Sequence, residues 1–480
     1  MNEAKLPATA LPIVSDTAPG AGPAPPDTAK FVDRALGKLS AAWRVIAGEA
    51  MPPEAQARQR WHERMQECLD GPGGEVAARA RTAALGHEYL GLSEAQRGAF
   101  LRVLAEEFDP PVEPILAAAD AVRAAKDGAE RHKAAAELVG ALEAPRLKLL
   151  TRFNALPQGV KFLVDLRATI MDLADGDPVF LGLLDDLTGL LRAWFDVGFL
   201  ELRRITWDSP ASLLERLIAY EAVHEIADWS DLKNRLDSDR RCFAFFHPRM
   251  PDEPLIFVEV ALTDGIADAI QPLLDPNAPV MDPAKANTAI FYSISNAQQG
   301  LAGISFGNFL IKQVVERLTH EFPQLKRFAT LSPIPGFVKW LKRQDGASLL
   351  TPAERRALPK RGDGDQHPLA LMRNPEWHRN RALATALKDP LMRLGARYLV
   401  AEKRPDGKAL DPVAHFHLTN GARIEQLDWL ADVSSKGLAQ SCGLMVNYLY
   451  RTNEIETNHE QYTGEGKIVT ASSIKSLAKA

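Results

Sequence analysis

Cysteine is scarce in this sequence, and long apolar runs are missing. The 480 residues include three cysteines, Cys68, Cys242 and Cys442, which lie far apart along the chain. Such scattered cysteines exclude a disulfide framework and a CxxC metal-binding knuckle, and they fit a reducing compartment. No apolar run reaches the roughly 18 residues that a membrane-spanning helix needs, so we expect no membrane as a partner.

An excess of basic residues is missing as well. The formal net charge is -5 at pH 7, and the isoelectric point is about 6.2. A general nucleic-acid-binding protein carries a dominant basic surface, so we expect no nucleic acid as a partner. Hydrophobic residues make up 46% and charged residues 25% of the chain, which is typical of a globular protein. The length suits two or three domains.

Targeting signals are not evident at either end. The first 28 residues are rich in Pro, Ala and Gly, and we predict a disordered tail over residues 1–28. This segment has neither the apolar core of a secretory signal nor the arginines of a transit peptide. The last residues, SLAKA, differ from a peroxisomal signal. We therefore expect a cytoplasmic protein.

Helical patterns dominate residues 29–203. The segment AKFVDRALGKLSAAWRVIAGEA places apolar residues near one helical face. The segment LSEAQRGAFLRVLAEEF begins with Ser93 three residues before Gln96, which is the spacing of a capping box. We predict an all-helical bundle over 29–203, with a role in oligomerisation or docking.

Strand patterns begin after residue 203. Strands that alternate with helices indicate a mixed α/β domain over residues 204–480. A polar segment at 347–380, rich in turn-forming residues, is predicted to be an inserted loop. Helices are predicted at 307–322 and 434–450. Short β-branched and aromatic runs predict strands at 241–247, 254–262, 288–294, 327–332, 397–402 and 413–418.

A glycine-rich segment follows the predicted strand at 288–294. The sequence NAQQGLAGISFGNFLIKQVVERL places Gly300, Gly303 and Gly307 before a helix. Glycines let a ligand come close to the backbone, and a helix N-terminus attracts phosphate oxygens. The spacing matches neither the P-loop nor the dinucleotide-binding GxGxxG. It is nearer to the acyl-CoA loop of GNAT-type acetyltransferases, without their strict spacing; a plain strand-to-helix loop is the alternative interpretation.

A serine stands at the end of another predicted strand, in RFATLSPIPGF. Pro333 favours an extended backbone at Ser332, and α/β sheets commonly place their sites at the carboxyl ends of strands. Two prolines and a glycine within five residues stiffen the chain around this hydroxyl. The segment lacks GxSxG, so it is not the nucleophile elbow of hydrolases. It is either a strand-terminating turn or a serine held for chemistry.

Two histidines lie two residues apart in PVAHFHLTNGA. In a strand, His415 and His417 would point to one face. A metal site needs three or four ligands, and the sequence offers no compelling third ligand, so we expect no metal. The remaining interpretations are a single catalytic histidine and a histidine buried in a half-exposed strand.

Four segments together resemble the malonyl-CoA decarboxylase family: FYSISNAQQGLAGISFGNFLIKQVVERL, FPQLKRFATLSPIPGFVKWL, PVAHFHLTNGARIEQLDWLADVS and SCGLMVNYLY. The resemblance is nearly continuous from RRITWDSP to Tyr450 and extends loosely into LPQGVKFLVDLRA. It implies an N-terminal helical domain followed by a GNAT-like catalytic domain. It also implies decarboxylation of malonyl-CoA to acetyl-CoA and CO2 by a homo-oligomer, either a tetramer or a dimer.

The resemblance further implies the site residues. The family's proton-transfer pair falls on Ser332 and His417, and a tyrosine near its site falls on Tyr450. Ser305 occupies a position that is acidic in some relatives, so the group that orients His417 is left open. The family's acyl-CoA-binding loop falls on Ala302, Gly303, Ile304, Ser305, Phe306, Gly307 and Asn308, with Ile311 one turn on.

The expected chemistry needs no cofactor. Loss of CO2 from malonyl-CoA leaves an enolate whose charge sits on the thioester oxygen, so the thioester is the electron sink. The site must stabilise this oxyanion and protonate C2. An imidazole suits the second task near pH 7; whether Ser332 or His417 donates the proton is left open.

Two other functions fit parts of the pattern. A GNAT-type acyl-CoA-dependent N-acyltransferase would use the same glycine-rich loop, and a non-catalytic acyl-CoA sensor would bind without turnover. The loop spacing argues against the first function. The presence of both Ser332 and His417 argues against the second.

Overall fold

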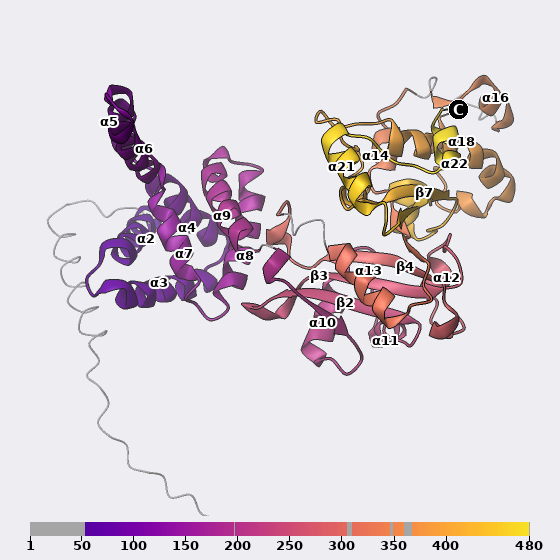
Figure 1. Cartoon of the computed structure of the whole chain (residues 1–480), viewed down its shortest axis with the longest axis horizontal. Helices are drawn as coiled ribbons and strands as arrows, with labels where there is room; N and C mark the ends of the chain where they lie inside the picture. Colours follow the sequence, from indigo (N-terminus) through magenta and orange to yellow (C-terminus); the bar gives the residue numbers. More distant parts are fainter. Residues whose placement is uncertain (1–52, 196, 305–309, 346–348, 360–366, 480) are drawn as a thin grey trace, which may run out of the picture. The chain divides into compact units, whose positions relative to one another are not determined.

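The computed structural model describes residues 53–195, 197–304, 310–345, 349–359 and 367–479. The chain divides into two compact units, residues 1–60 and 61–480. The tail predicted over residues 1–28 lies outside the described part. The second unit contains a helical region followed by a mixed sheet with its covering helices, as Figure 1 labels them. This order confirms the expected fold class.

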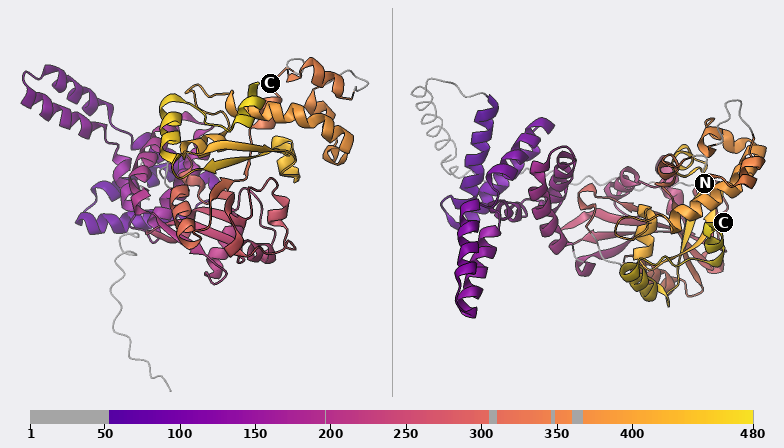
Figure 2. Two further views of the ribbon diagram at one scale, coloured as in Figure 1. Left: turned by 45° about the vertical axis from the view of Figure 1, so that its right-hand side comes forward. Right: turned by 90° about the horizontal axis from the view of Figure 1, so that it is seen from above.

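The helical region has no strand among its described residues up to 199. Ser93 caps α4 as predicted: its side chain accepts the backbone N–H of Gln96, and its own backbone N–H donates to the Gln96 side chain at 3.0 Å. The helices α5 and α6 lie side by side as a hairpin (Figure 2). The elements are α2 (Pro53–Asp70), α3 (Gly74–Leu90), α4 (Glu94–Glu107), α5 (Val112–Ala124), α6 (Gly128–Leu142), α7 (Pro145–Phe153), α8 (Gly159–Ala174), η1 (Pro178–Phe180), α9 (Leu181–Trp194) and η2 (Val197–Phe199).

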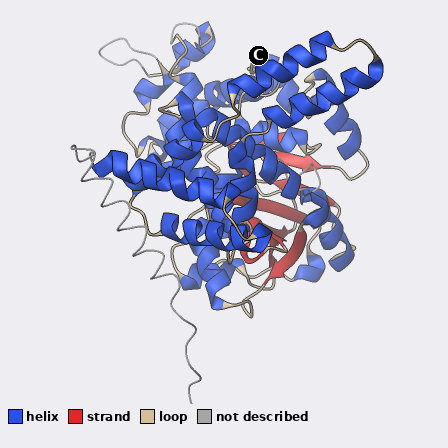
Figure 3. Cartoon of the chain, turned by 90° about the vertical axis from the view of Figure 1, so that its left-hand side faces the viewer, coloured by secondary structure: helices blue, strands red, loops and turns tan. Residues whose placement is uncertain are grey.

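The described strands form one eight-stranded sheet, coloured red in Figure 3. Neighbouring strands are antiparallel except for the parallel pair β4 and β5. Strand β8 pairs with β5 and β6 on one side and with β7 on the other. The strands are β1 (Glu201–Ile205), β2 (Arg240–His247), β3 (Met250–Thr263), β4 (Thr288–Asn296), β5 (Arg327–Thr330), β6 (Ser332–Pro333), β7 (Arg423–Asp428) and β8 (Met445–Tyr450).

Helices accompany the sheet along the rest of the chain. The described residues of the segment 347–380, for which a loop was predicted, include three helical elements. The elements are α10 (Ala211–Tyr220), α11 (Trp229–Arg235), α12 (Gln271–Leu274), η3 (Pro283–Lys285), η4 (Gln299–Leu301), α13 (Leu310–Glu321), α14 (Phe337–Leu341), α16 (Pro352–Ala357), α17 (Pro368–Leu371), η5 (Trp377–Arg379), α18 (Arg381–Val400), α19 (Pro412–Thr419), α20 (Ser435–Ser441), α21 (Ile455–Glu465) and α22 (Ser472–Lys479).

Two predicted strands are helices in the structure. The segment 397–402 contributes the last turn of α18, whose Leu394, Tyr398 and Leu399 are buried. The segment 413–418 lies inside α19. Asp411 accepts hydrogen bonds at the start of this helix and Pro412 occupies its first turn, which are the usual signals of a helix start. The strand prediction rested on a short β-branched and aromatic run, VAHFHL.

The helix predicted over 434–450 is also wrong. Helix α20 ends at Ser441 because Cys442 and Gly443 both adopt positive φ, at 54° and 79°. Consecutive left-handed residues stop a helix and redirect the chain. The residues that follow form β8, which is buried along its whole length. This strand carries Tyr450 to the site.

Candidate active site

Ser332 lies on the short strand β6, paired with β8 and almost fully buried at 5% exposure. Its side chain and that of Thr330, two residues earlier, share one face of the extended chain. The Ser332 hydroxyl donates to Thr330 Oγ1 at 2.8 Å. Thr330 Oγ1 also accepts the backbone N–H of Tyr448 at 3.1 Å. The serine is therefore fixed through a neighbour that is itself anchored to β8.

His417 meets Ser332 although the two residues are 85 positions apart. Its Nε2 lies 3.1 Å from Ser332 Oγ, and its Nδ1 lies 2.8 Å from the hydroxyl of Tyr450. The imidazole also stacks on the ring of Tyr448, with centroids 4.5 Å apart and planes inclined by 23°. Both ring nitrogens and one ring face are thus held.

These contacts form a continuous chain of hydrogen bonds. When Ser332 donates to Thr330, its oxygen is free to accept Nε2–H, and Nδ1 then accepts the Tyr450 hydroxyl proton. One tautomer of His417 therefore gives both ring nitrogens and the hydroxyls of Ser332 and Tyr450 a hydrogen-bond partner. Tyr450 is the described group that orients the ring from the side opposite Ser332. The sequence had left this group open.

Burial dominates the electrostatics of the site. The imidazole is 3% exposed, and loss of solvation lowers the pKa of His417 from 6.5 to about 3. The ring is therefore neutral at pH 7, whereas the sequence had suggested a histidine that titrates near neutral pH. Burial also raises the pKa of the Tyr450 hydroxyl well above its ordinary value. The hydrogen-bonded chain consists of neutral groups.

Asp411 joins the segment of Ser332 to the helix of His417. Its Oδ1 accepts the N–H groups that begin α19, those of Val413 and Ala414, each at 3.0 Å. Its Oδ2 accepts the N–H of Gly336 at 3.3 Å and the hydroxyl of Tyr398 at 3.3 Å. One carboxylate therefore caps the helix that carries His417 and holds the turn that follows Ser332.

Gly336 explains why the SPIPG turn ends in glycine. A Cβ at this position would lie 2.0 Å from the Tyr398 hydroxyl and 3.3 Å from Asp411 Oδ2. Only glycine lets the backbone reach the carboxylate at this distance. The stiff turn therefore connects the two halves of the site, and Ser332 lies at its beginning.

His415 belongs to a different contact. Because α19 is a helix, residues two apart do not share a face, and His415 Nδ1 lies 2.8 Å from the hydroxyl of Tyr462. The expectation that both histidines point to one face was wrong. Among the residues that the structure describes, no group of three or more His, Cys, Asp or Glu side chains is placed to hold a metal ion.

The glycine-rich segment is described only in part. Ser305, Phe306, Gly307 and Asn308 lie outside the described residues. Ala302, Gly303 and Ile304 are described, and Ile311 is buried on α13. Gly303 adopts φ +74° with open space around it, as a turn glycine does. In the part of the chain that the structure describes, these four residues make no hydrogen bond to Ser332, His417 or Tyr450.

Sequence reasoning missed two residues that shape the site, Thr330 and Asp411, and it did not predict the stacking of Tyr448 on His417. Thr330 could have been found from its place two residues before Ser332 in a strand. Asp411 could have been found as an Asp–Pro helix start. The stacking of Tyr448 could not be predicted, because the segment around it was interpreted as a helix.

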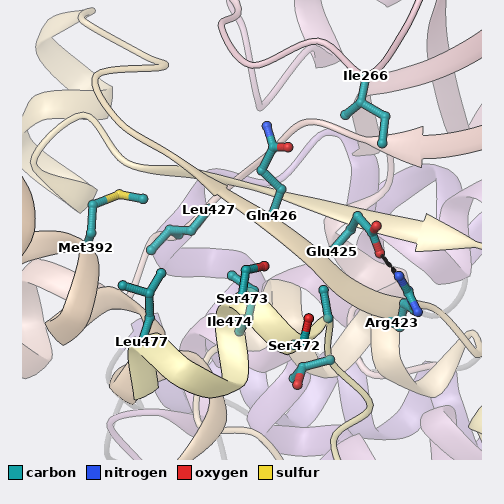
Figure 4. Close-up of a pocket in the computed structure, with 12 residues that line it drawn as sticks. Ile266, Met392, Arg423, Glu425, Gln426, Leu427, Ser472, Ser473, Ile474 and Leu477 are labelled. Atoms are coloured by element: carbon teal, nitrogen blue, oxygen red, sulfur yellow. Dashed lines mark hydrogen bonds and ion pairs between the residues drawn. The ribbon is translucent and has the colours of Figure 1, made fainter. Parts of the chain in front are cut away.

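A separate pocket of about 670 Å³ lies between β7, α22 and Met392 of α18. Figure 4 shows its lining side chains, with Arg423 paired to Glu425. Ser332, His417 and Tyr450 are not among the residues that line it. We assign it no part in the chemistry of the site.

The fold and the site define a class: a helical region joined to a mixed-sheet domain that carries a buried serine–histidine–tyrosine site. Residues 198–480 match the model of the malonyl-CoA decarboxylase C-terminal domain, and residues 108–195 match that of the N-terminal domain. The chain belongs to the malonyl-CoA decarboxylase family. No described helix is long and apolar enough to cross a membrane.

Individual relatives agree with this assignment. The protein of Anser anser anser named "Malonyl-CoA decarboxylase, mitochondrial" is 38% identical over 424 residues, which are 83% of each chain. The protein of the same name from Rattus norvegicus is 39% identical over 414 residues, covering 81% of this chain and 83% of its own.

Solved structures of malonyl-CoA decarboxylase give the same result. The crystal structure from Rhodopseudomonas palustris matches with a TM-score of 0.81 and 43% identity, covering 87% of this chain and 99% of its own. The crystal structure from Agrobacterium vitis matches with a TM-score of 0.77 and 41% identity over the same shares.

Proposed function

We propose that the chain is a malonyl-CoA decarboxylase, a carbon–carbon lyase that converts malonyl-CoA to acetyl-CoA and CO2. Family membership and the names of relatives about 40% identical support the reaction. One observation carries the mechanism: the buried contact of 3.1 Å between Ser332 Oγ and His417 Nε2. Two distant segments have been brought together around these two groups.

The reaction breaks one carbon–carbon bond and forms one carbon–hydrogen bond. The electron pair of the broken bond stays on C2 and spreads into the thioester carbonyl, and CO2 leaves. C2 then takes one proton. Each turnover therefore consumes one proton, which finally comes from water.

Ser332 and His417 supply the proton to C2 in this proposal. Because the pKa of His417 is about 3, the donor is a neutral group, either the Ser332 hydroxyl or Nε2–H. A carbanion next to a thioester is basic enough to take a proton from either group. The conjugate base that remains is reprotonated after the product leaves. Such positioned proton transfer contributes about 10²–10⁴-fold to a rate.

The thioester is held by the glycine-rich segment in this proposal. Ala302, Gly303, Ile304, Ser305, Phe306, Gly307, Asn308 and Ile311 are its proposed contacts. The open surroundings and positive φ of Gly303 support a backbone that a ligand can approach closely. The oxyanion of the enolate needs donors at hydrogen-bonding distance, each contributing about 3–4 kcal/mol.

A direct product assay tests the reaction. Purified protein is incubated with malonyl-CoA, with and without an amine acceptor, and the products are weighed by mass spectrometry. Acetyl-CoA and CO2 without acceptor are the expected products. An acylated amine with free CoA would instead identify an acyltransferase, and binding without turnover would identify a sensor.

We also propose a cytoplasmic location and a homo-oligomer, either a dimer or a tetramer. Free, buried thiols at all three cysteines fit a reducing compartment. The curated relatives above are named as mitochondrial proteins. Cell fractionation with antibodies to compartment markers distinguishes the two locations. Support for the oligomer comes from the exposed apolar residues of α5 and α6.

A further inference from the structure

Arg167 is a buried cation in the helical region that contacts the sheet domain. It lies on α8 and is 5% exposed. Its Nη1 donates to the carbonyl oxygens of Gly300 and Ala302, at 2.7 and 2.9 Å. Its Nε donates to Thr188 Oγ1 at 2.9 Å. These two carbonyls flank Leu301, and Ala302 is the first of the residues proposed to contact acyl-CoA.

The choice of partners is unusual for a buried arginine. Buried charges are normally paired with an opposite charge, because desolvation is costly. The described hydrogen-bond partners of Arg167 are a hydroxyl and two carbonyl oxygens, all of them neutral. Desolvation lowers the pKa of Arg167, and a guanidinium nevertheless stays charged. The free-energy cost of burying Arg167 is therefore offset by its hydrogen bonds to the backbone of residues 300–302 and to Thr188.

Gly300 brings the same segment against α8. A Cβ at Gly300 would lie 1.7 Å from the carbonyl oxygen of Val164. Gly300 therefore allows the 3-10 helix η4 to pack closely on α8. The positive φ of the turn that follows is adopted by Gly303. Gln299 adds a further contact to α8, from its Nε2 to Asp172 Oδ1 at 3.2 Å. The segment is fixed from the helical side.

We propose that Arg167 is a positioning residue for acyl-CoA binding, which it promotes by fixing the backbone of residues 300–302. This inference rests on the proposed function, because it takes Ala302, Gly303 and Ile304 as substrate contacts. It assigns the helical region a part in substrate binding in addition to assembly. The contact joins the two matched family domains, residues 108–195 and 198–480.

Steady-state kinetics of the full-length chain test the proposal. We expect Arg167→Met to raise the KM for malonyl-CoA about tenfold and to change kcat less than about threefold. The substitution removes the hydrogen bonds that fix the backbone of residues 300–302 before substrate binds, so binding must supply the ordering of this segment. Arg167→Lys keeps the positive charge but lacks the planar set of guanidinium donors, so its KM should lie between those of the wild type and Arg167→Met.

A matched control separates positioning from stability. Arg146 is another buried arginine of the helical region, and it pairs with Asp186 at 2.6 Å. Arg146→Met should lower the melting temperature and leave the KM unchanged. An unchanged KM in Arg167→Met, or an equal rise in Arg146→Met, would overturn the proposal.

Two further measurements keep the result decisive. Gly300→Ala perturbs the same segment, so it should also raise the KM; it decides the question if Arg167→Met fails to fold. Calorimetric titration with malonyl-CoA is run on each variant. A wild-type chain that binds malonyl-CoA without turnover contradicts the proposed function, whereas weaker binding by Arg167→Met still supports the role of Arg167. Equal binding by wild type and both variants contradicts that role.

Discussion

Two hydroxyl groups hold the two nitrogens of His417, at 2.8 Å from Tyr450 and 3.1 Å from Ser332. Removing the Tyr450 hydroxyl leaves Nδ1 without its described partner, so the ring loses its fixed tautomer. We expect Tyr450→Phe to lower kcat about 10-fold to 100-fold, with little change in KM, in line with the contribution of positioned groups. Fixed-time assays of acetyl-CoA formation measure kcat and KM for both proteins. A wild-type kcat in Tyr450→Phe would contradict a positioning role for the Tyr450 hydroxyl.

The pH dependence of stability reports the burial of His417. Between pH 6.5 and about 3 the unfolded chain binds a proton at this residue that the folded chain does not bind. The stability that this group contributes is therefore complete above pH 6.5 and is lost as the pH falls. On going from pH 7 to pH 5, the wild type should lose about 2 kcal/mol of unfolding free energy that His417→Asn keeps.

Urea unfolding of both proteins at the two pH values measures this difference. His224, whose pKa burial lowers to about 4, titrates in both proteins and cancels in the comparison. Equal losses in the two proteins would mean that His417 has an ordinary pKa.

Residue-level prediction from the sequence had a clear limit. Ser332 and His417 were selected through family resemblance and local stiffness. Their contact depends on a sheet register and on a helix that the sequence pattern did not show. The stacking of Tyr448 on His417 was not predicted, because the strand that carries it was interpreted as a helix.

At the scale of elements, the turn after Ser332 depends on one glycine. A methyl group at Gly336 would meet the Tyr398 hydroxyl at 2.0 Å. We expect Gly336→Ala to cost about 1–3 kcal/mol of stability, as overpacking does. Tyr398→Phe removes the clashing atom, so the double variant should be more stable than Gly336→Ala alone. Thermal and urea unfolding of the four proteins form a double-mutant cycle. Strictly additive effects would contradict the steric explanation.

Strands β2, β3 and β4 were predicted better than the two elements that carry His417 and Tyr450. Strands β2, β3 and β4 were expected and are present, because long β-branched and aromatic runs give a strong signal. The two elements that carry His417 and Tyr450, α19 and β8, were each assigned the wrong type. Side-chain capping by Asp411 decided α19, and the left-handed backbone of Cys442 and Gly443 ended α20 before β8. Both local features outweighed the hydrophobic pattern.

At the scale of the whole molecule, the hairpin of α5 and α6 is the proposed assembly surface. Helix α5 has no buried residue, and Leu116 and Val139 are 60% and 70% exposed. Exposed apolar side chains on two helices that pack together favour association. The double variant Leu116→Glu, Val139→Glu should shift the mass measured by light scattering toward the 52.6 kDa of one chain.

An exposed leucine elsewhere in the helical region provides the control. Leu181 at the start of α9 is 50% exposed, and Leu181→Glu should leave the assembly intact. A hairpin variant with the wild-type mass would exclude this surface.

The order of a helical region and a mixed-sheet domain could be predicted from the sequence, because the hydrophobic period changes along the chain. The contact of Arg167 with Gly300 and Ala302 could not, because it joins residues more than 130 positions apart. Long-range contacts of this kind leave no local pattern in a single sequence.

The most direct test of the account is a double-mutant cycle at Ser332 and His417, read out as kcat for the conversion of malonyl-CoA to acetyl-CoA. Two groups that act as one proton-transfer unit have strongly non-additive effects. Ser332→Ala and His417→Ala should each lower kcat about 10²–10⁴-fold, and the double variant should be scarcely worse than either single variant. Full activity in either single variant, with the protein folded, would contradict the central claim.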